Sequence, residues 1–244
     1  TARPEWPIFS RQRDLSPVTS ALERRGREKS VDEFGPSFGE AFRDEFAALL
    51  RWRRDVRHFR RDPITPALLE SFLDAACLAP SVGYSQPWRF VEVASVRARQ
   101  AVIVNFERCN AEALAQYEGG RALNYAALKL AGLREAPVQL AVFTDGETQV
   151  GHGLGRRTMP QTLDYSTVMA IQNFWLAARA AGVGVGWVSI LDPEALRADL
   201  DIPGGWRLTA YLCVGYPEAP SDEPELARRG WETRHGPSRE LLSR

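Results

Sequence analysis

Apolar residues recur at helical spacing in four stretches of the chain, and each stretch predicts a helix. The first begins near Phe38. The second begins after Thr65, whose side chain suits an N-cap, and stops before Pro80. The third covers 96–117, and the fourth covers 167–181 and is apolar on nearly all sides, which predicts a helix at the centre of the fold. The face that we expect the first helix to bury comprises Phe38, Phe42, Phe46, Leu49 and Leu50.

Short apolar runs rich in β-branched and aromatic residues predict the strands. The four clearest runs are 90–93, 138–144, 183–190 and 208–214. Between the last two, Asp192 precedes Pro193, a combination typical of the start of a short helix. Because helices and strands alternate along the chain, we expect a layered α/β or α+β domain around a central sheet.

The folded domain is expected to cover 38–216, with a different kind of sequence on each side. Residues 1–37 carry prolines, glycines and charges without periodicity, which predicts an extended or partly disordered arm. This arm either has no function or is anchored on a neighbouring surface by its apolar residues, which are Trp6, Ile8 and Phe9. Residues 217–244 are polar and contain several prolines, and we expect them to wrap a partner subunit.

The charge balance argues against some classes of partner. The 31 basic and 31 acidic side chains give a formal net charge of zero, so the chain has no overall field to attract nucleic acid or an anionic membrane. No apolar run reaches the length of a membrane helix or resembles a signal-peptide core, so we expect a cytoplasmic protein. Cys77, Cys109 and Cys213 are far apart, which indicates neither a disulfide framework nor a metal site.

A cluster of arginines follows the first helix. The sequence Arg53-Arg54-Asp55-Val56-Arg57 places three guanidinium groups within five residues, and such groups can converge on one phosphate. The alternative is a solvated cationic helix end, which the helix dipole favours. The pattern alone leaves both interpretations open.

The segment from Ser81 to Trp88 predicts a second binding element. Pro80 bends the chain, Gly83 supplies flexibility, and Ser81 and Gln86 offer hydrogen-bonding groups. The Gln86 amide can both donate and accept, which suits a ring edge that carries a carbonyl and an N–H. Trp88 is equally a candidate for the hydrophobic core.

Glycines alternate in the third segment of interest, at Gly182, Gly184 and Gly186. This spacing lets either another backbone or a planar ligand approach closely. The pattern matches GxGxxG poorly and does not lie at a strand-to-helix turn, which argues against a nucleotide-binding Rossmann loop.

Together, in this order and spacing, the three segments resemble the nitroreductase-like flavoprotein family over roughly residues 40 to 235. The resemblance implies an α+β, three-layer fold with a central mixed or antiparallel sheet flanked by helices. It also implies an entwined homodimer that binds FMN at the subunit interface. The FMN contacts that the resemblance implies are Arg53, Arg54, Asp55, Val56, Arg57, Ser81, Gly83, Gln86, Trp88, Ser166, Ser189 and Arg234.

Within the family, three details resemble the branch in which reduced FMN is itself the substrate. The arginine cluster reads Arg-Arg-Asp where other members commonly have Arg-Arg-Ser, the loop reads Ser-Val-Gly-Tyr-Ser-Gln-Pro-Trp, and residues 164–168 lead into the central helix. This branch fragments reduced FMN with dioxygen to 5,6-dimethylbenzimidazole, the lower ligand of cobalamin. The resemblance further implies a separate flavin reductase that supplies reduced FMN, and a lid over the flavin formed by 105–137.

Two residues are candidates for the chemistry that this branch needs. Asp55 can accept a proton beside the ribityl chain, and Ser166 can donate a hydrogen bond to an oxygen adduct. The structural alternatives are an ion pair between Asp55 and a neighbouring arginine, and an N-cap role for Ser166. Two other functions stay open: an NAD(P)H-dependent nitroreductase or flavin reductase, which needs an open face over the flavin, and a non-catalytic flavin-binding protein.

Overall fold

The computed structural model describes residues 31–32, 35–233, 236 and 241–243. It divides into two compact units, Thr1–Asp44 and Glu45–Arg244. In the first unit, strands β1 (Val31–Asp32) and β2 (Gly35–Pro36) pair antiparallel. The second unit contains the sheet and every candidate site residue that the structure describes.

Helix α2 (Glu40–Trp52) corresponds to the first predicted helix, but its apolar face is not buried. Four of its expected core residues are between 43 and 48% exposed, namely Phe38, Phe42, Phe46 and Leu50. The prediction of a buried face is therefore wrong. Helical spacing identifies the apolar side of a helix, but it does not show that the same chain covers that side.

The second unit is built on a four-stranded sheet in the order β3-β4-β6-β5. The strands are β3 (Trp88–Glu92), β4 (Val138–Asp145), β6 (Trp206–Gly215) and β5 (Gly184–Val188), and every pair of neighbours is antiparallel. At the β5 edge, Asp55 adds a parallel bridge to Val185. The sheet is thus antiparallel in its strands, with one parallel bridge where the arginine cluster meets it.

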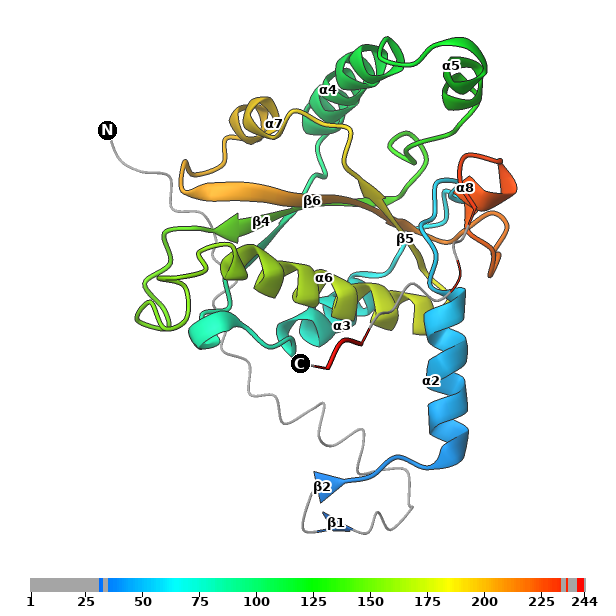
Figure 1. Ribbon diagram of the computed structural model, residues 1–244. Helices are drawn as coiled ribbons and strands as arrows, with labels where there is room; N and C mark the ends of the chain where they lie inside the picture. Colours follow the sequence, from blue (N-terminus) through cyan, green and yellow to red (C-terminus); the bar gives the residue numbers. More distant parts are fainter. Residues whose placement is uncertain (1–30, 33–34, 234–235, 237–240, 244) are drawn as a thin grey trace. The chain divides into compact units, whose positions relative to one another are not determined.

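Alternation along β4 separates two hydrophobic layers. Leu140 and Val142 belong to one cluster and Ala141 and Phe143 to the other, because successive side chains point to opposite faces of a sheet. Helices α3 (Pro66–Cys77) and α6 (Thr162–Ala180) cover one face, and α4 (Val96–Leu114), α5 (Gly119–Ala126) and α7 (Pro193–Asp199) lie on the other side (Figure 1). The predicted three-layer α+β fold is confirmed.

Two predicted helix starts are present as hydrogen-bonded caps. The Thr65 hydroxyl accepts from Leu68 N at 3.3 Å, and Asp192 Oδ1 accepts from Glu194 N and Ala195 N, both at 3.1 Å. The pKa of Asp192 is held below its ordinary value by the bonds from the Ala195 and Glu194 amides and by the Arg108 guanidinium, although partial desolvation acts in the opposite direction. Local side-chain chemistry therefore located these boundaries correctly.

The central helix α6 begins at Thr162, five residues before its predicted start at 167. Ser166 consequently lies inside the helix, and the alternative that it is the N-cap is wrong. Polar residues 162–166 hid the start, since the prediction relied on apolar periodicity. At the other end, Gly182 has φ +77° and ends the helix as expected.

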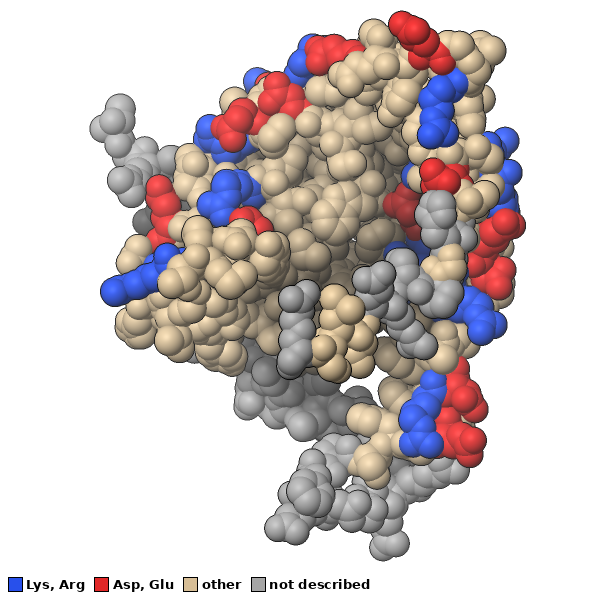
Figure 2. All heavy atoms as spheres, in the orientation of Figure 1, with Lys and Arg blue, Asp and Glu red and all other residues tan. Residues whose placement is uncertain are grey.

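None of the helices in the described ranges is long and apolar enough to cross a membrane. On the face shown in Figure 2, basic and acidic side chains are interleaved, and no single-sign patch dominates this view. This distribution agrees with the formal net charge of zero.

Candidate functional site

The arginine cluster forms a turn that is seated against β5. Val56 N donates to Val185 O at 3.0 Å. A Cβ added at Gly186 would overlap the Val56 carbonyl oxygen, and one added at Gly184 would lie 2.8 Å from a Val56 methyl group. The alternating glycines therefore admit the backbone of the turn, the first of the two interpretations that their spacing allowed.

Asp55 uses both carboxylate oxygens. Oδ1 accepts from Trp187 N, the backbone amide of β5, and Oδ2 accepts from Arg57 Nε, both at 2.8 Å. The side chain is still 32% exposed. The ion pair expected as the structural alternative is thus present, and the carboxylate remains accessible to a ligand.

The three guanidinium groups of the turn are each held by a different partner. Arg53 lies 4.9 Å over the Trp175 ring, Arg54 Nε donates to Asp222 O at 2.7 Å, and Arg57 Nη1 donates to Lys129 O at 3.3 Å. The Arg57 side chain is only 12% exposed. This arrangement differs from a solvated cationic helix end, and it fixes the arginines before any ligand binds.

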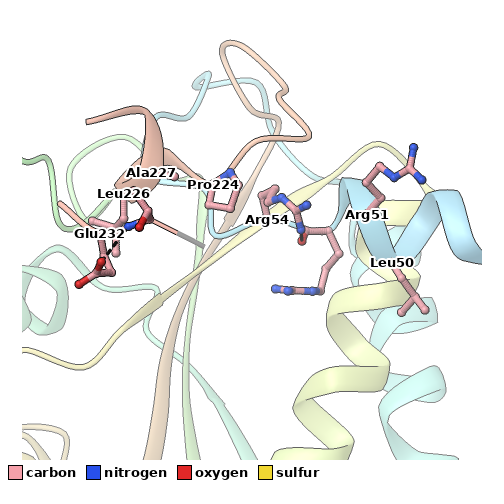
Figure 3. A pocket seen from close by; sticks show the side chains of 9 residues that line it. Leu50, Arg51, Arg54, Pro224, Leu226, Ala227 and Glu232 are labelled. Carbon is pink, nitrogen blue, oxygen red and sulfur yellow. Dashed lines mark hydrogen bonds between the residues drawn. The ribbon is translucent and has the colours of Figure 1, made fainter. Parts of the chain in front are cut away.

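A cavity of about 710 Å³ opens beside this turn (Figure 3). Its volume is in the range of about 300–1,000 Å³ that is usual for small-molecule and cofactor sites. Figure 3 shows residues from the end of α2 and the turn on one side, and residues from the segment after Pro224 on the other. The lining residues are Leu50, Arg51, Arg53, Arg54, Pro224, Leu226, Ala227, Glu232 and Thr233.

Sequence reasoning missed the C-terminal wall of this cavity. Residues 217–244 were expected to wrap a partner, but the described part up to Thr233 contacts its own chain, for example through Asp222 O and Glu225. Only the run of glycine and tryptophan at Gly230-Trp231 hinted at an ordered turn. Arg234, the weakest of the implied phosphate ligands, lies outside the described residues.

A second group of candidate residues surrounds the loop after α3. Ser81 Oγ accepts from Gln86 N at 3.1 Å, which closes the loop around the 3₁₀ turn η1 (Val82–Tyr84). Gly83 has φ +57°, and a Cβ there would lie 2.9 Å from Leu154 O, so the expected need for glycine is confirmed. The side chain of Gln86 is exposed, and its amide is accessible to a ligand.

Ser166 joins this loop to α6. Its hydroxyl accepts from Val82 N at 3.0 Å and donates to Thr162 O at 2.7 Å. Trp88, in contrast, is 7% exposed and packs in the core between the sheet and α6. The core interpretation of Trp88 therefore holds, and the structure does not present it to a ligand.

The two groups lie toward opposite ends of α6. Ser166 is near the start of this helix and Trp175, under Arg53, is nine residues later, a rise of about 14 Å along the axis. Ser189 is exposed just after β5, the strand on which the arginine turn is seated. The structure thus brings the candidates together as two clusters rather than as one.

The expected lid, 105–137, begins with the last turns of α4, where Asn105 is buried, and then contains two further kinds of structure. Its middle is the mostly exposed helix α5. Its last part is core, because Leu133 and Ala136 are buried and the Arg99 guanidinium donates to the carbonyls of Ala136 and Pro137.

Comparison with known proteins gives a consistent set of relatives. A model described as the nitroreductase family matches residues 50–216. A 5,6-dimethylbenzimidazole synthase of Rhodospirillum rubrum is 56% identical over 200 residues, which cover 82% of this chain and 95% of that protein. A second 5,6-dimethylbenzimidazole synthase, from Rhodobacter capsulatus, is 48% identical over 196 residues, which cover 80% and 95% of the two chains.

Solved structures agree on the fold. Oxidized iodotyrosine deiodinase, crystallised with FMN and 3-iodo-L-tyrosine, superposes with a TM-score of 0.62 at 24% sequence identity. The match covers 81% of this chain and 97% of the deiodinase chain.

Proposed function

We propose, from the premise that this chain belongs to the nitroreductase family, that it fragments reduced FMN with dioxygen and releases 5,6-dimethylbenzimidazole, the lower ligand of cobalamin. The observation that carries the proposal is the 56% identity to a 5,6-dimethylbenzimidazole synthase over 95% of the length of that enzyme. A match of this extent includes all the described candidate residues rather than an isolated motif. The reaction is oxidative, and the chain is an oxidoreductase.

The residues present fit FMN. Arginines line the cavity, and guanidinium groups favour phosphate. The backbone of the turn that carries the arginine cluster packs closely against two glycines of β5, which fixes its position. We assign Arg53 and Arg57 to the phosphate and ribityl chain, and Ser81, Gln86 and Ser189 to the flavin ring. Reduced FMN, when bound, supplies the ring that reacts with dioxygen and the ribityl C1′ that becomes C2 of the product.

Asp55 is proposed as the base. Its Oδ1 is held by the Trp187 amide and its Oδ2 by Arg57, so the carboxylate is oriented without being enclosed. A proton taken from the ribityl chain would be accepted at Oδ2 if Arg57 turned towards the phosphate. The same ion pair that the structure shows would then serve as the resting state of the base.

Ser166 is proposed as the hydrogen-bond donor to oxygen. Its proton now points to Thr162 O, while its oxygen accepts from Val82 N. Rotation of the hydroxyl would redirect the donor and leave the bond from Val82 in place. Ser166 is only 1% exposed, so donation to a bound oxygen species would also require the loop over it to move.

We also propose a homodimer with FMN at the interface. The separation of the arginine turn from the Ser81 loop along α6 supports it, because a second copy could place its own loop beside the turn of the first. Light scattering at micromolar concentration with FMN bound should give twice the chain mass, and a monomer would contradict the proposal.

A family nitroreductase that takes hydride from NAD(P)H is the alternative. The proposed reaction instead requires a separate flavin reductase to supply reduced FMN, with the region around α5 restricting access to the bound flavin. Mixing the FMN complex with NADH or NADPH distinguishes the two. Rapid bleaching of the flavin without an added reductase would favour the nitroreductase.

The proposed reaction itself is tested in a single turnover. The protein is loaded with reduced FMN without oxygen and then exposed to air, and flavin, dimethylbenzimidazole and hydrogen peroxide are measured in the same sample. We expect flavin to be lost as dimethylbenzimidazole appears. Full recovery of oxidised FMN with hydrogen peroxide would contradict the function and would instead fit a protein that only binds flavin.

A further inference from the structure

The C-terminal segment ends its short helix in a tightly defined turn. Helix α8 (Glu225–Arg228) is followed by Gly230 at φ +67°. Gly230 N donates to Ala227 O at 3.0 Å and Trp231 N donates to Leu226 O at 2.9 Å, the two bonds of a Schellman motif. The backbone of Trp231 is thus fixed by α8.

Trp231 makes the aromatic contacts between this segment and the region around α5. Its ring lies 5.5 Å from that of Tyr117 and 5.9 Å from that of Tyr125, both edge-to-face, and the two tyrosines stack at 4.9 Å. The Arg121 guanidinium lies 4.5 Å over the Trp231 ring, and its Nη1 donates to Trp231 O at 2.9 Å. Asn124 adds a bond to Gly230 O at 3.2 Å.

Helix α5 depends on these contacts. It has eight residues, and helices of this length are not stable on their own in water. Leu123 is 76% exposed, and Tyr125 is the buried residue of the helix. Burial raises the pKa of Tyr125, whose hydroxyl donates to Asn110 Oδ1 at 2.8 Å, so the ring stays neutral in the stack.

The opposite side of the same segment faces the cavity. Leu226, Ala227 and Glu232 line it across from Arg54 (Figure 3). Before α8, Asp222 O accepts from Arg54 Nε, and at its start Glu225 lies 3.2 Å from His58 Nε2. One short segment therefore touches both the arginine turn and α5.

We propose that Trp231 is a positioning residue that fastens α5 to the wall of the cavity, and that this attachment keeps the bound flavin closed off during its reaction with dioxygen. The second part rests on the proposed function. The first part is a property of the chain without ligand and stands or fails separately.

Amide hydrogen exchange on the full chain without FMN tests the attachment. In Trp231→Ala, exchange of residues 119–126 should rise about ten- to a hundredfold, because two aromatic pairs and one cation–π contact are lost. Trp231→Phe should stay within a few-fold of the unmodified chain. Trp206→Ala is the matched control. The Trp206 ring also lies beside an arginine, with the Arg89 guanidinium 5.6 Å from it, but Trp206 is at the start of β6, away from α5. Unchanged exchange of α5 in Trp231→Ala overturns the proposal.

Arg121→Gln keeps the test decisive if Trp231→Ala does not fold, because Arg121 is exposed and supports no core contact. It should raise amide exchange of α5 several-fold and leave exchange of β4 and β6 unchanged. Unchanged exchange in α5 would count against the attachment.

A product measurement tests the role in closure. In air with reduced FMN, Trp231→Ala should shift the products from dimethylbenzimidazole to hydrogen peroxide, and Trp231→Phe should restore dimethylbenzimidazole. If exchange of α5 changes but the product ratio does not, the attachment by Trp231 is supported and its role in closing off the flavin is refuted. A parent chain that makes no dimethylbenzimidazole would instead refute the proposed function.

Discussion

The arginine turn and helix α5 are held in opposite ways. The turn fits its backbone between two glycines of β5, and the side chain of Phe59, just after it, is buried. Helix α5 is attached through rings and one guanidinium near the surface. The arginine turn is thus fixed by the sheet, while α5 is attached by contacts near the surface that can open.

In the proposed reaction, anchoring of the flavin and access to it would then depend on two differently held parts of the fold. Opening the turn would require breaking the ladder bond from Val56 to Val185 and the bond from Trp187 to Asp55. Opening α5 requires the separation of Trp231 from its aromatic neighbours and the loss of the side-chain bonds from Arg121 and Asn124, without any break in the sheet. Substitutions in the two regions should therefore change different measurements.

The largest effect is expected from Asp55→Asn. The amide can still accept from Trp187 N, so folding and FMN binding should be retained, whereas product formation should fall by about 10²–10⁴-fold, as is usual when a general base is lost. Product yield, FMN affinity and melting temperature are measured on the same variant. Full activity would remove Asp55 from the chemistry, and a lowered melting temperature alone would indicate a structural ion pair.

Gly186→Ala tests how rigidly the arginine turn is held against β5. The new Cβ would meet a backbone carbonyl, which cannot move aside as a flexible side chain can, so we expect a loss of about 3 kcal/mol in the free energy of unfolding, at the upper end for overpacking. FMN binding should weaken in parallel. Unchanged stability in denaturant unfolding would show that the turn is as adaptable as α5.

Arg53→Ala should weaken FMN binding about ten- to a hundredfold, because a charge-assisted hydrogen bond contributes about 1.5–3 kcal/mol. Arg134→Ala, an exposed arginine paired with Glu107, is the control and should bind FMN normally. Equal affinity in both variants, measured by fluorescence titration, would remove the phosphate assignment.

The smallest effect is expected from Gly120→Ala in α5, where an added Cβ meets nothing within 4 Å. Alanine should stabilise this helix by about 0.5–1 kcal/mol relative to glycine. Amide exchange of 119–126 should slow accordingly, without a change in FMN affinity. The same type of substitution thus destabilises the arginine turn and stabilises α5, and faster exchange in α5 would contradict this contrast.

The sequence predicted features that depend on local chemistry. The caps at Thr65 and Asp192, the end of α6 at Gly182 and the four strands follow from side-chain bonds, backbone freedom and periodicity within a few residues. Three-layer packing followed from the alternation of helices and strands, and the family resemblance specified it further.

Features that depend on distant contacts could not be predicted in the same way. Nothing near Asp55 shows that its carboxylate binds the amide of Trp187, 132 residues later, and backbone partners such as Asp222 O leave no signal in the sequence. The exposed face of α2 was expected to be buried for the same reason, since periodicity shows which side is apolar but not what covers it. The C-terminal wall of the cavity belongs to this class as well.

The most direct test of the account uses FMN labelled with carbon-13 at the ribityl C1′. The labelled, reduced flavin is bound to the protein and exposed to air, and dimethylbenzimidazole is analysed by mass spectrometry. We expect a product that is one mass unit heavier, with the label at C2. Intact labelled FMN as the only flavin product, with hydrogen peroxide beside it, would contradict the claim that this chain fragments its flavin.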